Sequence, residues 1–172
     1  QFLLFSYIPP KMKVVIKIKL SKYINIISGG TPKTTIDEYW NGEIPWISIK
    51  DFNNSSKYIY KTEKSITELG LKKSATNVLK PNDIIISARG TVGCLAQIIK
   101  PMAFNQSCYG IRTTSEKLDQ NYLYYWLLYN VPKFQKNTHG STFDTITKDT
   151  FNCFEINIPN LDIQHYIIDI IQ

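Results

Sequence analysis

The spacing of apolar residues changes at Leu118, and this change limits the folds that the chain can adopt. Before Leu118, short apolar runs that end at Gly, Pro or polar residues predict strands at residues 14–20, 43–49, 84–87, 94–99 and 107–113. After it, six apolar residues recur at the spacing of a helix: Leu118, Tyr122, Leu123, Tyr125, Trp126 and Tyr129. Asp119 is a suitable N-cap for that helix. Residues 154–158 then alternate as a strand, and an amphipathic helix begins at Leu161. The sequence therefore predicts an α+β fold, a β-rich globular domain with peripheral helices.

Glycine and proline mark the expected turns. Residues 29–33 predict a turn, because Gly29 and Gly30 can adopt backbone angles that a Cβ forbids. Gly90 and Gly93 frame a second tight turn. Pro45 is expected to confine its strand to a sheet edge or to the start of the strand. Residues 63–79 predict one or two short helices interrupted by Gly70, and residues 136–146 are polar and turn-like.

The positive charge is concentrated in two stretches of the chain. The net charge is +6. Residues 1–36 hold six lysines and no acidic residue, and residues 50–100 hold nine basic and four acidic residues. Clustering on one folded face would form an electrostatic surface for phosphates, whereas scattered lysines would be an ordinary solvated face. We expect both stretches to share one face, with the C-terminal helix turned away from it.

Composition and targeting signals indicate a soluble cytoplasmic protein. Hydrophobic residues make up 43% and charged residues 20%, values that exclude a disordered chain. The three cysteines, Cys94, Cys108 and Cys153, are far apart and predict free, mostly buried thiols. No apolar run approaches the roughly 20 residues of a membrane span, and residues 1–8 lack the features of a signal peptide. Because the chain begins with Gln and stops inside an apolar periodic segment, we expect it to be part of a longer product.

The residues of common catalytic sites are missing from the sequence. The only histidines are His139 and His165, and no GxSxG, HExxH, GxxxxGK[ST] or GxGxxG motif occurs. His139, Ser141 and Asp144 lie too close in sequence for a normal catalytic triad. The sequence also offers no metal-ligand cluster. These absences favour a binding module over an enzyme.

Several motifs, in their order and spacing, carry a resemblance to a known family. They occupy residues 27–34, 39–47, 83–93 (with the run Ser87-Ala88-Arg89-Gly90), 140–146 and 154–159, followed by Leu161 and Gln164. The chain resembles, from about residue 8 to residue 172, a target recognition domain of a type I restriction-modification DNA specificity (S) subunit. The resemblance implies a DNA target recognition domain at residues 8–160 and the truncated start of a spacer (coiled-coil) helix at residues 161–172.

The resemblance also implies a function and partners. The family's subunit is non-catalytic and binds double-stranded DNA, each of its two domains recognising one half of a split target. Methyltransferase (modification) subunits bring S-adenosylmethionine, and restriction subunits bring ATP- and Mg-dependent activity, so no cofactor is expected in this chain. The chain would be a fragment of a two-domain subunit, a half-subunit that forms a homodimer through its C-terminal helix, or a shortened relative. The alternative function is a dimerising or partner-docking module that has lost DNA recognition; a membrane partner is not expected.

Eleven residues are candidates for contacts with DNA. Arg89, beside Thr91 in the Gly90 turn, suits guanine or phosphate, with a structural pair to a carboxylate as the alternative. Asn105 and Gln106 suit adenine, although turn formation explains Asn105 equally well. Lysines suit phosphates, with solvated surface or the dipole of a helix end as the alternatives. The other candidates are Lys33, Lys50, Lys72, Lys73, His139, Ser141 and Thr142.

Two aromatic groups are expected in the core rather than on DNA. Trp40 and Trp46 flank a bend around Gly42 and Pro45, where packing is more common than base stacking. Tyr122, Tyr125 and Trp126 recur at helical spacing and are expected to form the buried face of their helix.

Overall fold

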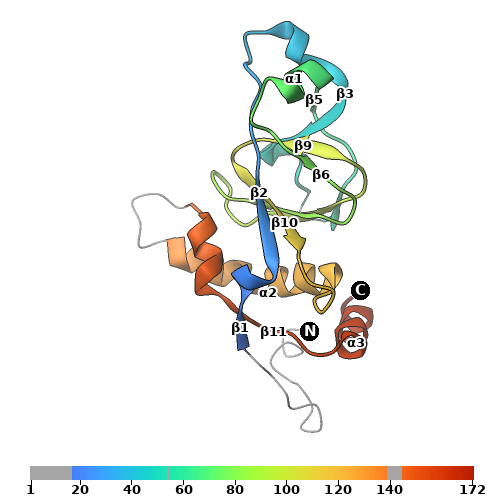
Figure 1. The fold of residues 1–172 in the computed structure, drawn as a ribbon, viewed down its shortest axis with the longest axis vertical. Helices are drawn as coiled ribbons and strands as arrows, with labels where there is room; N and C mark the ends of the chain where they lie inside the picture. Colours follow the sequence, from blue (N-terminus) through green and yellow to red (C-terminus); the bar gives the residue numbers. More distant parts are fainter. Residues whose placement is uncertain (1–16, 54, 139–144) are drawn as a thin grey trace.

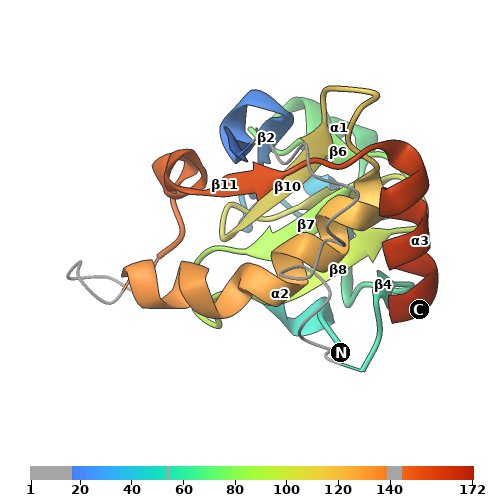
Figure 2. The same ribbon diagram turned by 90° about the horizontal axis from the view of Figure 1, so that it is seen from below.

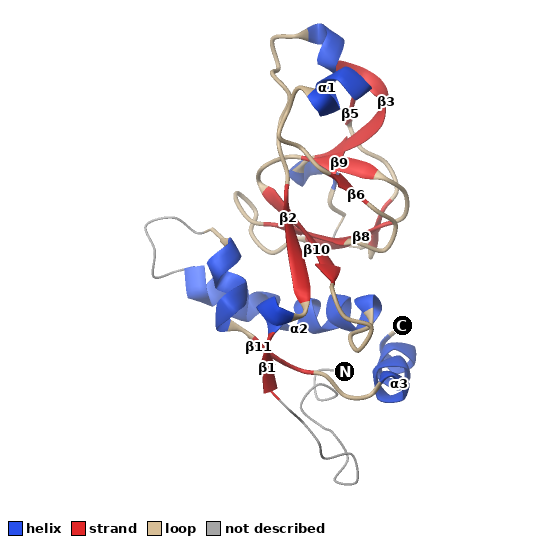
Figure 3. Cartoon of the chain, viewed as in Figure 1, coloured by secondary structure: helices blue, strands red, loops and turns tan. Residues whose placement is uncertain are grey.

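Three sheets and three α-helices make up the part of the chain that the computed structural model describes, residues 17–53, 55–138 and 145–172. The α-helices α2 and α3 lie at one end of the elongated molecule, beside the two-stranded sheet, and α1 lies at the other end, with the two larger sheets between them (Figure 1). The distribution of helices and strands along the chain is shown in Figure 3. The predicted α+β class is confirmed.

A five-stranded sheet forms the centre of the molecule, in the order β2-β10-β7-β8-β4. Its strands are β2 (Ile24–Ser28), β4 (Tyr58–Ile59), β7 (Ile84–Ser87), β8 (Leu95–Ile98) and β10 (Cys108–Thr113). Neighbouring strands are antiparallel except β4 and β8, which are parallel. All four residues of β7 are buried, as expected for a strand with partners on both sides. The strands predicted near residues 84–87, 94–99 and 107–113 are therefore confirmed.

A four-stranded sheet with the order β5-β3-β9-β6 extends the molecule towards α1. Its strands are β3 (Trp40–Ile47), β5 (Lys64–Ile66), β6 (Val78–Leu79) and β9 (Met102–Phe104). The prediction that Pro45 confines its strand to an edge is wrong for the strand as a whole, because β3 lies between β5 and β9. Pro45 is tolerated because β9 pairs only with Trp46 and Ile47, so the missing N–H removes no bond to that strand.

Short elements connect and complete these sheets. β1 (Lys17–Lys19) pairs antiparallel with β11 (Glu155–Asn157), which confirms the strand predictions at both ends of the chain. Only α1 (Glu68–Lys72) lies between residues 63 and 79 as a helix, and Gly70 is inside it rather than an interruption. The 3₁₀ helices are η2 (Leu20–Lys22), η3 (Asp37–Tyr39), η4 (Ile49–Asp51) and η5 (Lys148–Cys153).

Helix α2 (Gln120–Thr138) covers one face of the five-stranded sheet, crossing β10, β7 and β8 (Figure 2). Leu123 and Leu127 are fully buried in the core that this helix shares with Ile84 and Ile86 of β7. Asp119 caps the helix, its carboxylate Oδ1 accepting from the amides of Asn121 (2.7 Å) and Tyr122 (3.1 Å), as predicted. The polar segment predicted at residues 136–146 is wrong at its start, because α2 continues to Thr138. No described helix is long and apolar enough to span a membrane.

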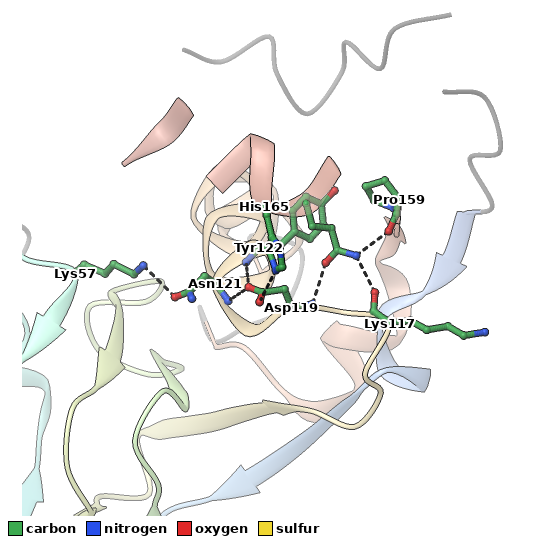
Figure 4. A network of polar contacts seen from close by, with 8 residues as sticks. Lys57, Lys117, Asp119, Asn121, Tyr122, Pro159 and His165 are labelled. Carbon is green, nitrogen blue, oxygen red and sulfur yellow. Dashed lines mark hydrogen bonds and ion pairs between the residues drawn. The ribbon is translucent and has the colours of Figure 1, made fainter. Parts of the chain in front are cut away.

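Helix α3 (Leu161–Ile171) packs against α2 through buried Gln164, Ile167 and Ile168. The Gln164 amide accepts from the Asp119 N–H (2.9 Å) and donates to the carbonyls of Lys117 and Pro159 (both 2.7 Å) (Figure 4). The assignment of residues 161–172 to a spacer helix, separate from a domain at residues 8–160, stays a prediction.

A series of polar side-chain contacts connects α3 to Lys57, the residue directly before β4, across the start of α2 (Figure 4). His165 lies 3.5 Å from the carboxylate of Asp119, and Lys57 donates to Asn121 Oδ1 (3.1 Å). The Lys57 ammonium also lies 4.6 to 5.5 Å from the ring centroids of Tyr58, Tyr124 and Tyr125. Burial lowers the pKa of Lys57, and Asp119 opposes that shift. Lys57 therefore joins the sheet edge to α2 instead of presenting a free charge.

Gly29 and Gly30 are required for close packing, which corrects the reason predicted for them. Neither glycine adopts a positive φ, whereas Gly90 (φ 75°) and Gly93 (φ 92°) do, as the predicted turn requires. A Cβ on Gly29 would lie 2.0 Å from the carbonyl oxygen of Asn105, and one on Gly30 would lie 2.4 Å from the amide nitrogen of Thr76. Only glycine lets these three backbone segments touch.

The variant Gly29→Ala is expected to lose at least about 1–3 kcal/mol of unfolding free energy, because the backbone of Asn105 must move away from the new methyl group. Urea unfolding followed by circular dichroism measures the loss. Thr34→Ala, at an exposed position of the same loop, is the control and should unfold like the wild type. Equal stability of Gly29→Ala and wild type would contradict the close contact.

Candidate nucleic-acid interface

The turn at residues 104–107, between β9 and β10, joins several loops through its backbone. The Phe104 carbonyl accepts hydrogen bonds from the Gly30 amide (2.9 Å) and from the Thr76 hydroxyl (2.8 Å). The Ser107 carbonyl accepts from the amides of Ala88 (2.7 Å) and Arg89 (3.2 Å). We call the resulting assembly of residues 28–33, 74–77, 88–93 and 104–107 the loop platform. It brings together segments that are far apart in the sequence.

Further bonds hold the segments of the loop platform to one another and to Trp46 of β3. The Trp46 indole N–H donates to the Gly30 carbonyl (3.0 Å), and the Asn77 amide donates to the Ser28 carbonyl (2.9 Å). Thr76 is buried, and its hydroxyl oxygen also accepts from the Phe104 amide (3.3 Å). These contacts fix the backbone of the loops, so the Cα atoms from which the exposed side chains extend have defined positions.

The loop of residues 88–93 presents Arg89 and Thr91 to solvent. The buried Ser87 hydroxyl donates to the Thr91 carbonyl and accepts from the Cys94 amide (2.8 Å), which closes the base of this loop. The guanidinium of Arg89 makes no hydrogen bond or ion pair with any other described residue. A planar donor group on a tightly held loop is suited to bases or phosphates.

The structural role considered for Arg89 belongs instead to Arg112 on β10. The Arg112 Nε donates to Asp83 Oδ1 (2.6 Å) and its Nη2 to Asp83 Oδ2 (2.5 Å), a bidentate pair. Asp83 is buried, and the hydrogen bond to it raises the pKa of Arg112. Of the two arginines in the chain, Arg112 is thus committed to the fold, whereas Arg89 is exposed and has no partner among the residues that the structure describes.

Asn105 and Gln106 differ although they are neighbours on the same turn. The Asn105 Oδ1 accepts from the Ser107 amide (3.1 Å), so this side chain forms the turn. Gln106 is exposed, and its Oε1 accepts from the Thr31 hydroxyl. The geometry thus favours the turn-forming alternative for Asn105 and leaves Gln106 available for recognition.

The candidate lysines lie on or beside the loop platform, and their contacts with DNA remain predictions. Lys33 is exposed on residues 28–33, and its carbonyl accepts from the Trp40 indole (3.2 Å). Lys72 and Lys73 are exposed at the end of α1, directly before residues 74–77. Lys50 lies on η4, with its ammonium 3.6 Å from the Glu63 carboxylate, an exposed pair that contributes little to stability.

The two basic stretches do not share one face in the way predicted. Lys17 and Lys19 are on β1 and Lys22 is on the adjoining η2, at the end of the molecule that holds α2 and α3 (Figure 1). Lys72 and Lys73 are on α1 at the opposite end. The expectation is wrong for Lys17, Lys19 and Lys22, because the pairing of β1 with β11 carries this segment away from the loops.

The remaining candidates, His139, Ser141 and Thr142, lie outside the described residues. The chain that follows them returns to the loop platform, where the Ile146 amide donates to the Ala88 carbonyl (2.9 Å).

The aromatic residues occupy the core positions predicted for them. Trp46 is buried and packs edge-to-face against Trp40, with 5.2 Å between the ring centroids. On α2, Tyr122 and Trp126 are buried in the core, and Tyr125 is half-buried against Lys57. The buried rings of Trp46, Tyr122 and Trp126 are not available for base stacking, whereas Trp40 and Tyr125 are half-buried.

Thr31 and Thr76 are the platform residues that sequence reasoning did not select. Their hydroxyls bond to the 104–107 turn, which is far away in sequence, so no local pattern indicated them.

The prediction of mostly buried thiols is confirmed only in part: Cys108 is buried, Cys94 is half-buried and Cys153 is exposed. Burial raises the pKa of Cys108 to about 12, so this thiol stays protonated and inert. No three His, Cys, Asp or Glu residues gather as a metal site in the described ranges.

Comparisons with known proteins point to one family. A family model described as the type I restriction modification DNA specificity domain matches residues 13–172. The chain is 32% identical over 160 residues to the type I restriction enzyme MjaIX specificity subunit of Methanocaldococcus jannaschii, which covers 90% of this chain and 36% of that protein. It is 30% identical over 146 residues to the EcoprrI specificity subunit of Escherichia coli, which covers 83% of this chain and 36% of the relative. The chain thus spans about a third of the length of these curated relatives.

Solved structures show the same fold. The HsdS subunit from Thermoanaerobacter tengcongensis superposes with a TM-score of 0.71 at 21% identity, covering 95% of this chain and 37% of that one. The S subunit of a type I restriction-modification system from M. genitalium gives a TM-score of 0.70 at 13% identity, with 97% and 44% covered.

The two arginines are expected to respond differently to replacement by lysine. Arg112→Lys keeps the charge but loses one arm of the pair with buried Asp83, so the unfolding free energy should fall by roughly 1–3 kcal/mol. Arg89→Lys, the matched control, should unfold like the wild type because its side chain is exposed and unpaired among the described residues. Thermal and urea unfolding of both variants measure this, and a loss of stability in Arg89→Lys as large as in Arg112→Lys would refute the division of roles.

Proposed function

This chain belongs to the type I restriction modification DNA specificity domain family, and we propose that it is a non-catalytic domain that binds one half of a split double-stranded DNA target. The observation that carries the proposal is the loop platform, which holds exposed polar side chains from separate segments on a rigid backbone. Arg89 stands on this platform with an exposed guanidinium that no other described residue pairs, while Arg112 stabilises the fold.

Arg89 and Gln106 are the residues that we assign to base edges. Both are exposed. Gln106 stands on the turn that supplies the Phe104 and Ser107 carbonyls, and the Arg89 loop is bonded to the Ser107 carbonyl. A guanidinium suits the O6 and N7 acceptors of guanine, and a side-chain amide suits adenine. The lysines around the platform, with Thr91, His139, Ser141 and Thr142, are assigned to the phosphates or to further base contacts, because phosphate contacts position a protein without specifying sequence.

The partners follow from the family. The curated relatives are specificity subunits of type I restriction enzymes, and we infer that this chain assembles with methyltransferase (modification) and restriction subunits. In that assembly S-adenosylmethionine, ATP and Mg²⁺ belong to the partner subunits, and the complex works in the cytoplasm. The exposed side chains of Tyr166 and Ile170, one turn apart on α3, supply an apolar surface for a partner helix, from another subunit or from a second copy of this chain.

DNA binding should weaken steeply as salt rises, because each phosphate neutralised by a lysine or arginine releases condensed counterions. Fluorescence anisotropy, with duplexes selected from a randomised pool and with unrelated duplexes, measures both affinities across a salt series. Salt-independent binding, or no duplex bound by the wild-type chain, would exclude the proposed function and favour a module that only docks partners.

Arg89→Ala should weaken binding to selected duplexes by roughly tenfold to a hundredfold, the value of one good bidentate base contact, and should affect unrelated duplexes much less. Lys22→Ala is the control, since Lys22 lies at the α2 and α3 end of the molecule and should leave both affinities unchanged. Equal losses on both kinds of duplex would make Arg89 a phosphate contact.

A further inference from the structure

Thr31 and Gln106 meet at the surface of the loop platform. The Thr31 hydroxyl donates a hydrogen bond to the Gln106 Oε1, joining the loop after β2 to the turn between β9 and β10. The two backbones are already held together at this point, because the Gly30 amide donates to the Phe104 carbonyl (2.9 Å). The Gly30 carbonyl is in turn held by the Trp46 indole (3.0 Å). The side-chain contact is therefore set by a rigid frame beneath it.

This contact gives the Gln106 amide a direction. The oxygen and nitrogen ends of a glutamine amide have nearly the same shape, so an isolated side chain can turn either end towards a ligand. A donated hydroxyl hydrogen can pair only with the oxygen end. The Nε2 group makes no hydrogen bond with another described residue, so its two N–H donors stay free on an exposed side chain.

An acceptor lies beside these free donors. The Gln106 Oε1 has two lone pairs and uses one for Thr31, and the Thr31 oxygen keeps its own lone pairs because it acts as the donor. The pair thus offers a donor and an acceptor side by side. In the major groove, adenine presents the matching set, the N7 acceptor next to the N6 amino donor.

We propose that Thr31 is a positioning residue that orients Gln106, and that this pair makes the domain prefer adenine at one position of its half-target. The inference rests on the proposed function and deepens it by naming the base. Asn105 does not share this role, because its Oδ1 is used by the Ser107 amide (3.1 Å) within the turn.

The test compares base preferences of the wild-type chain and four variants, obtained by selection from randomised duplexes and sequencing. Gln106→Glu keeps an acceptor for Thr31 but replaces the outward donors with acceptors, so the preferred base should change from adenine to cytosine, whose N4 amino group is a donor. Thr31→Val removes the hydroxyl and keeps the shape of the side chain, so the adenine preference should fall by about tenfold. Thr31→Ser restores the hydroxyl and should restore the preference.

The fourth variant, Thr34→Val, removes an exposed hydroxyl from the same loop and should select the same sequence as the wild type. Thermal unfolding of each variant identifies any that fail to fold, and the pair Thr31→Ser and Thr31→Val decides the question even if Gln106→Glu is lost.

A simple brace between two loops would give a different result: Thr31→Val would weaken all duplexes equally and Gln106→Glu would leave the preferred base unchanged. That outcome overturns the inference while the proposed function stands. A wild-type chain that selects no sequence at all removes the proposed function and this inference together.

Discussion

Two carbonyl groups, those of Phe104 and Ser107, hold the surface loops of this domain in place. They accept hydrogen bonds from the backbone or hydroxyl groups of three other segments, and the missing Cβ atoms of Gly29 and Gly30 let those segments approach closely enough. Three of these four bonds join main-chain atoms, and the fourth comes from the Thr76 hydroxyl. The side chains that point outwards from the loops can therefore differ between proteins of this fold without loosening the frame, which suits the recognition of DNA sequence that we propose for this domain.

The division of work between the two arginines follows from the same frame. Asp83 precedes β7 directly, and β7 pairs with β10 so that Ile84 lies opposite Ile111, which brings Arg112 beside the Asp83 carboxylate. Burial of that carboxylate makes the bidentate partner indispensable. Arg89 leaves the other end of β7 into solvent, where no described carboxylate competes for it. The strand thus carries a structural ion pair at one end and, at the other, the exposed guanidinium that we propose contacts DNA.

Local patterns in the sequence predicted the long elements well, because burial of one face imposes a period on the residues. The helix beginning beside Asp119, the buried run of β7 and the alternating strand near Ile156 all follow this rule. The two-residue strands β4 and β6 are too short to have a period. Their partners, β8 and β9, are distant in sequence, so pairing could not be inferred. For the same reason the sequence did not indicate Thr31 and Thr76, whose contacts are all long-range. The pairing of β1 with β11 was equally invisible, so the position of Lys17 and Lys19 was predicted incorrectly.

The pairing of β1 with β11 has a consequence for how the chain folds. Lys17 lies opposite Asn157, so this small sheet closes a loop that contains almost every other described element. Closing so long a loop carries an entropic cost, so we expect β1 to pair with β11 late in folding. All five strands of the central sheet precede Thr114, whereas α2, which covers that sheet, gains its Tyr122–Asn157 contact only after β11 is in place. During synthesis β1 must therefore wait for β11, and a chain interrupted before β11 can still form the hydrogen bonds of the loop platform but lacks the strand that pairs with β1 and accepts the hydrogen bond of the Tyr122 hydroxyl.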